Sequence, residues 1–76
     1  MPHVIVKLYK GRSEQQKAKI AEAVTRAIVS AADSTDDAIS VGIEDIEPAD
    51  WDAKVWQPDI AGKAGTLYEK PGYGNL

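Results

Sequence analysis

The sequence predicts an α/β (α+β) fold in which a β-α-β unit is followed by a short second helix. Residues 2–9 and 38–46 alternate in polarity as strands do. The long segment between them has apolar residues spaced three and four apart, which is typical of an amphipathic helix. Strand, helix and strand in this order favour two parallel strands with a right-handed crossover.

The first strand and the helix after it have clear local signals. Val4, Val6 and Leu8 share one face of residues 2–9. Gly11 supplies a turn, and Ser13 followed by Gln16 forms a capping-box pattern, so a helix is expected from there to about residue 32. Its predicted buried stripe consists of Ile20, Val24, Ala27, Ile28 and Ala31.

The second half of the chain is less regular. Residues 33–37 (DSTDD) read as a polar loop before the second strand, and residues 47–56 as a turn or a single helical turn. Pro58 is predicted to begin a last helix that ends near Glu69, before Pro71-Gly72. Its expected inward residues are Ile60, Ala64, Leu67 and Tyr68. No linker or repeat interrupts the chain, so a single domain over 1–76 is expected.

Composition excludes several functional classes. The net charge of −3 argues against a nucleic-acid-binding surface. The chain has no cysteine and a single histidine, His3, so no metal site or other cofactor is expected. No long apolar segment suggests a membrane span or signal peptide. A soluble, cytoplasmic protein is the default expectation.

Size and sheet edges both predict self-association. A chain of 76 residues rarely obtains much stability from its own core, and neither disulfides nor metal are expected to supplement it. Two parallel strands leave two open edges, and the first strand is largely apolar on both faces. A homo-oligomer that completes the sheet is therefore expected.

Pro2 directly follows the initiator methionine, which is normally removed before a small residue. Pro2 would then carry a free secondary amine. An α-amino group has a pKa of about 7.7–8.0, and burial among apolar side chains lowers it. Such an amine suits a general base near neutral pH. The alternative is structural, because proline is also tolerated at the first position of a strand.

Arg12 is the natural ligand for a substrate carboxylate, because guanidinium binds carboxylates through two parallel hydrogen bonds. A strand rises about 3.3 Å per residue, so Arg12 should lie roughly 20 Å or more from Pro2 of its own chain. Arg12 can therefore serve only the Pro2 of another subunit. A solvated loop charge is the competing interpretation.

Four segments of the chain carry a family resemblance. The opening P-H-V-I-V-K with K-G-R-S-E-Q-Q-K resembles the tautomerase superfamily founded on 4-oxalocrotonate tautomerase. The segments I-E-P-A-D-W and K-P-G-Y are similar to the slightly longer PptA-type members. The resemblance implies that Pro2 is the general base, that Arg12 binds the substrate carboxylate, and that Trp51 is an apolar pocket residue that keeps the pKa of the proline amine low.

Ser40 departs from the family pattern. Hexameric members use a second arginine there to polarise the substrate carbonyl, and Arg26, in mid-helix, is a poor substitute. The loss could cost about 3 kcal/mol, which disfavours a dicarboxylate substrate and favours a monoacid such as an aryl enolpyruvate. PptA-type relatives diverge similarly and are dimers, so a dimer is favoured over a hexamer.

Other polar and aromatic residues have structural interpretations. His3 alternates away from Pro2 and is expected to be a hydrogen-bonded structural histidine. Trp56 reads as a core or interface anchor, and Tyr73 as a residue that could cover a neighbouring subunit. The carboxylates on alternating faces near the end of the second strand read as solvated: Glu44, Asp45 and Glu47.

Together these residues predict a cofactor-independent isomerase, a keto-enol tautomerase of enol or unsaturated 2-keto acids. One alternative within the superfamily is a dehalogenase, hydratase or decarboxylase in which a cationic Pro2 acts as a general acid. A second alternative is a self-associating binding module with no catalytic role for Pro2. The physiological substrate is not specified by these residues.

Overall fold

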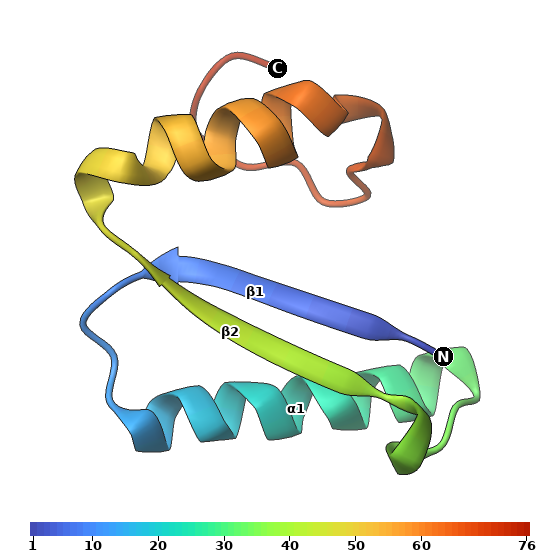
Figure 1. The fold of residues 1–76 in the computed structure, drawn as a ribbon. Coiled ribbons are helices and arrows are strands. Elements are labelled where there is room, and N and C mark those ends of the chain that lie inside the picture. The colour runs from blue at the N-terminus through green and yellow to red at the C-terminus, as the bar shows by residue number, and fades with distance from the viewer. The chain divides into compact units, whose positions relative to one another are not determined.

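Two parallel strands, β1 (His3–Tyr9) and β2 (Ser40–Ile46), form the sheet in the computed structural model, which describes all 76 residues (Figure 1). The helix α1 (Glu14–Ala32) connects them, and η1 (Asp36–Ala38), a single 3₁₀ turn, precedes β2. The predicted β-α-β unit is confirmed. The chain divides into two compact units, Met1–Asp45 and Ile46–Leu76, and a single domain over 1–76 stays a prediction.

The start of α1 has the predicted capping box. The Ser13 hydroxyl accepts from the Gln16 backbone N–H at 3.1 Å, while the Ser13 N–H donates to the Gln16 side-chain oxygen at 2.9 Å. Gly11 turns the chain before it with a φ of 127°, a conformation that a residue with a Cβ rarely adopts. The helix ends at Ala32, and Asp33 caps it in the left-handed region.

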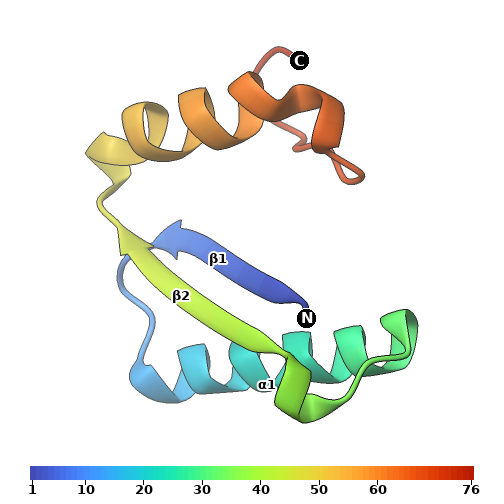
Figure 2. The same cartoon turned by 45° about the vertical axis from the view of Figure 1, so that its right-hand side comes forward.

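One face of the sheet is covered by α1 and the other is open in the N-terminal unit (Figure 2). On the covered face Val4, Val6 and Leu8 are half-buried. The buried stripe of α1 is shifted from the prediction, because Ala27 and Ala31 are exposed. The half-buried stripe instead consists of neighbouring residues that recur every four positions: Ile20 and Ala21, Val24 and Thr25, Ile28 and Val29.

The short second helix is present but begins ten residues earlier than predicted. Pro48 starts it as the first residue of the 3₁₀ turn η2 (Pro48–Asp50), and η3 (Asp52–Ile60) continues in π-type turns through Pro58. A proline inside an α-helix clashes with the carbonyl one turn earlier, and wider turns relieve that clash. Pro58 is therefore an internal residue of the helical segment.

The helical segment also ends early. The 3₁₀ helix η4 (Ala61–Thr66) stops three residues before the predicted Glu69, because Gly62, Lys63 and Gly65 interrupt it and Lys63 has non-helical dihedral angles. Tyr68 and Ala64 were predicted inward and are exposed. Val55 is the most buried side chain of this unit, at 4% exposure.

Candidate active site

Pro2 lies half-buried at the head of β1. Its carbonyl oxygen accepts a hydrogen bond from the Ser40 backbone N–H at 3.2 Å, which fixes the register of the two strands at this end. Met1 is fully exposed before it. While Met1 is attached, the Pro2 nitrogen is an amide without a basic lone pair. The secondary amine exists only after Met1 is removed, and nothing in the fold covers that residue.

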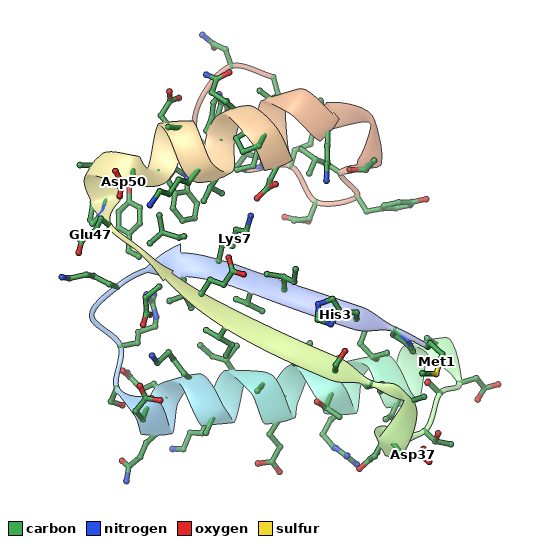
Figure 3. The ribbon with its side chains drawn as sticks, in the orientation of Figure 1. Met1, His3, Lys7, Asp37, Glu47 and Asp50 are labelled. Atoms are coloured by element: carbon green, nitrogen blue, oxygen red, sulfur yellow. The ribbon has the colours of Figure 1, made fainter.

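His3 and Ser40 occupy the open face of the sheet beside Pro2. The His3 Nδ1 atom lies 2.6 Å from the Ser40 hydroxyl, and both side chains are exposed. Figure 3 shows the His3 ring at the Met1 end of β1. His3 thus has a hydrogen-bonded partner, as a structural histidine would. That partner is the residue at which the family resemblance implies an arginine.

Arg12 lies beyond the opposite end of β1 from Pro2. Its guanidinium donates to the Tyr9 carbonyl oxygen at 3.3 Å and is otherwise exposed. The seven residues of β1 span about 23 Å at the ordinary rise of a strand. Arg12 is therefore too far from Pro2 of the same chain to bind a shared small substrate.

Trp51 lies in the C-terminal unit, half-buried. Its indole N–H donates to the Tyr73 hydroxyl oxygen at 3.1 Å. The Tyr73 ring also packs against Trp56, with 5.4 Å between ring centroids and a tilt of 43°. Tyr73 therefore contacts the tryptophans of its own chain, a role that sequence reasoning missed. The signal available was an aromatic residue in a Pro-Gly-rich tail.

Several other charged side chains of the N-terminal unit form ion pairs. Lys17 of α1 contacts Asp45 of β2 at 2.8 Å and Glu14 at 3.0 Å. Hydrogen bonds to Asp45 and then to Glu14 raise the pKa of Lys17 above its ordinary value. Arg26 pairs with Asp36. The side chain of Arg26 is thus engaged in an ion pair at η1. The position in β2 at which the family resemblance implies a second arginine is occupied by Ser40.

No three histidine, aspartate or glutamate side chains gather closely enough to hold a metal ion. None of the helices has the length and apolar character needed to cross a membrane.

Known proteins that are similar to this chain are tautomerases. The sequence profile of the family described as "Tautomerase enzyme" matches residues 2–55. A "Probable tautomerase" of Xylella fastidiosa is 37% identical over 76 residues, covering 100% of this chain and 93% of the relative. "Tautomerase PptA" of Escherichia coli is 39% identical over 74 residues, covering 96% of this chain and 97% of the relative.

Solved structures give the same family. YwhB, a homologue of 4-oxalocrotonate tautomerase, is 35% identical with a TM-score of 0.59, covering 60% of this chain and 75% of YwhB. TomN, a 4-oxalocrotonate tautomerase homologue in the tomaymycin biosynthetic pathway, is 34% identical with a TM-score of 0.64, covering 66% and 77%. The chain belongs to the tautomerase family of enzymes and is similar to its PptA members.

Proposed function

We propose that the chain, once Met1 is removed, is a cofactor-independent keto-enol tautomerase of enol or unsaturated 2-keto acids, with Pro2 as general base. The observation that carries the proposal is the place of Pro2 in a tautomerase fold. It is half-buried at the head of β1, at the first residue that the family profile matches. A cytoplasmic location stays a prediction.

The proposed reaction moves one proton and changes no other atoms. The Pro2 amine takes the proton of the enol hydroxyl, the electron pair of that O–H bond becomes the carbonyl, and the carbon–carbon double bond shifts its electrons to the neighbouring carbon. The Pro2 ammonium then delivers a proton to that carbon. No oxidant, reductant or cofactor enters the balance, which places the reaction among intramolecular isomerisations.

The active site that we propose needs more than one subunit. Arg12 lies beyond the far end of β1 from Pro2, so the carboxylate-binding arginine would come from a partner chain. The two-stranded sheet leaves both outer edges unpaired, which also favours association. A homodimer is our preferred assembly, with a hexamer as the alternative. Trp51 is proposed as the apolar residue that lowers the pKa of the proline amine.

The decisive experiment compares wild type and Pro2→Ala in the ketonisation of phenylenolpyruvate, the simplest aryl enolpyruvate. Both proteins must show by intact mass that Met1 is absent. Loss of a general base should lower kcat by about 10²–10⁴-fold. Equal rates for the two proteins would show that Pro2 is a strand-starting residue only, and would favour the binding module.

A further inference from the structure

A hydrogen-bonded pair lies beside the proposed base, on the face of the sheet that α1 leaves open. The His3 Nδ1 and Ser40 Oγ atoms are 2.6 Å apart, and the Ser40 backbone N–H holds the Pro2 carbonyl at 3.2 Å. These contacts tie Pro2, His3 and Ser40 into one group at the head of the sheet. Both side chains of the pair are exposed.

The pair of His3 and Ser40 is the polar group on the open face of the sheet at the Pro2 end of β1. The next residues on the open face are Ile5 and Gly42, which offer no polar side chain. The neighbouring turn η1 contributes two carboxylates that already have partners. Asp36 pairs with Arg26, and Asp37 accepts from the Thr35 hydroxyl at 2.6 Å.

The direction of the hydrogen bond between Ser40 and Nδ1 is linked to which nitrogen of the His3 ring carries the proton. If the Ser40 hydroxyl donates to Nδ1, the single ring proton lies on Nε2; if Nδ1 donates to the Ser40 oxygen instead, Nε2 is an acceptor. In the first arrangement Nε2 is a hydrogen-bond donor. A histidine held in this way can donate to an oxygen on which negative charge develops.

We propose that His3, positioned by Ser40, donates a hydrogen bond to the carbonyl or enol oxygen of the substrate. This inference rests on the proposed function and defines its substrate class more narrowly. One imidazole N–H can serve one oxygen, whereas a guanidinium also binds a second carboxylate. The pair therefore suits monocarboxylic 2-keto acids, with the single carboxylate left to Arg12 of a partner subunit.

The kinetic test uses two substitutions, each of which places an amide nitrogen near the position of a different ring nitrogen of His3. Asparagine places an amide nitrogen near the position of Nδ1 and nothing at Nε2, while glutamine reaches the position of Nε2. In processed protein acting on phenylenolpyruvate, His3→Asn should lower kcat by about 10–100-fold with KM changed by less than about threefold. His3→Gln should recover part of that loss. Glu44→Gln, on the same face but farther along β2, is the control and should match wild type.

A second measurement does not depend on turnover. His3 is the only histidine of the chain, so its ring nitrogens can be observed alone by NMR in untagged protein. In the inactive Pro2→Ala protein the ring should hold its proton on Nε2, and Ser40→Ala should produce a mixture of tautomers. Saturation with phenylpyruvate should shift the Nε2 signal, and tryptophan fluorescence monitors the degree of saturation.

The outcomes separate this inference from the proposed function. If Pro2→Ala abolishes activity while His3→Asn stays within about twofold of wild type, His3 is only structural and the inference is wrong. A ring proton found on Nδ1, or ring signals unchanged at saturation, would overturn it as well. If wild type itself does not ketonise the substrate, the proposed function fails first.

Discussion

Trp51 and Tyr73, 22 residues apart in sequence, are joined by a hydrogen bond of 3.1 Å from the indole N–H to the phenol oxygen. The same phenol ring packs against Trp56. The C-terminal tail thus returns along the helical turns of its own unit, as Figure 2 also shows. This hydrogen bond occupies the indole N–H of Trp51.

Removing the Tyr73 hydroxyl should loosen Trp51 while keeping the ring on Trp56. We expect Tyr73→Phe to lower the free energy of unfolding by about 0.5–1 kcal/mol, the net value of one hydrogen bond, and to change tryptophan fluorescence. Urea unfolding measures the first effect. Tyr68→Phe is the matched control, because Tyr68 is fully exposed and loses the same atom. Equal effects of the two substitutions would contradict the assignment.

Gly74 is expected to be essential for the return of the tail. Its φ of 76° disfavours any Cβ, and a Cβ there would lie 2.2 Å from the Trp56 ring. Gly74→Ala should therefore cost about 1–2 kcal/mol or release the tail, with a weaker near-ultraviolet circular dichroism signal. Gly72→Ala should be nearly neutral, because an added Cβ there meets nothing within 4 Å. A neutral Gly74→Ala would show that the tail does not pack in this way.

Lys17 should make stability depend on pH in the alkaline range. Its pKa is raised above the ordinary 10.5 by Asp45 and then Glu14. A raised pKa in the folded state stabilises the fold below the unfolded value, and that contribution disappears as pH rises through the folded value. The urea midpoint of wild type should thus fall above about pH 10.5 more steeply than that of Lys17→Met. Lys19→Met, on the exposed face of α1, should keep the wild-type slope.

The capping box of α1 should be worth about 1 kcal/mol. Ser13→Ala removes the oxygen that accepts from the Gln16 N–H and should lower the free energy of unfolding by about that amount in urea titrations. Ser30→Ala makes the same chemical change at an exposed position near the end of α1, where alanine is the better helix former. It should be neutral or slightly stabilising, and a comparable loss there would remove the special role of Ser13.

A mixing experiment tests whether Arg12 acts in a partner's active site. Pro2→Ala and Arg12→Ala should each be nearly inactive. In a randomly mixed dimer population about half of the dimers contain one chain of each, with one intact site, so activity should return to about a quarter of wild type. No recovery after verified subunit exchange would place Arg12 outside the site, as a solvated loop charge.

Local sequence signals predicted the N-terminal unit well. The bounds of β1 and α1, the capping box of Ser13 and Gln16, and the turn at Gly11 all follow from residues within a few positions of one another. The place of Arg12 at the far end of β1 from Pro2 follows too, because the rise of a strand is nearly constant. Pro2, Arg12 and Trp51 as site residues remain predictions.

The start of the second helix was misplaced for a local reason. Pro48 and Pro58 both satisfy the preference of proline for the first helical turn, and the sequence carries no signal for the wider turns that accept Pro58 internally. Pattern reasoning therefore selected the later proline. Of the residues predicted to face inward, Ala64 and Tyr68 are exposed, whereas Ile60 and Leu67 are half-buried.

The sequence by itself determined the order of the elements, the capped helix and the glycine turn, because short-range periodicity and hydrogen bonding decide them. Only the tertiary structure decided the long-range pairs: His3 with Ser40, Lys17 with Asp45, and Trp51 with Tyr73. Such pairs form when strand register and the return of the chain bring distant residues within about 3 Å. A shift of one residue in a strand would turn the side chains of that strand to the other face.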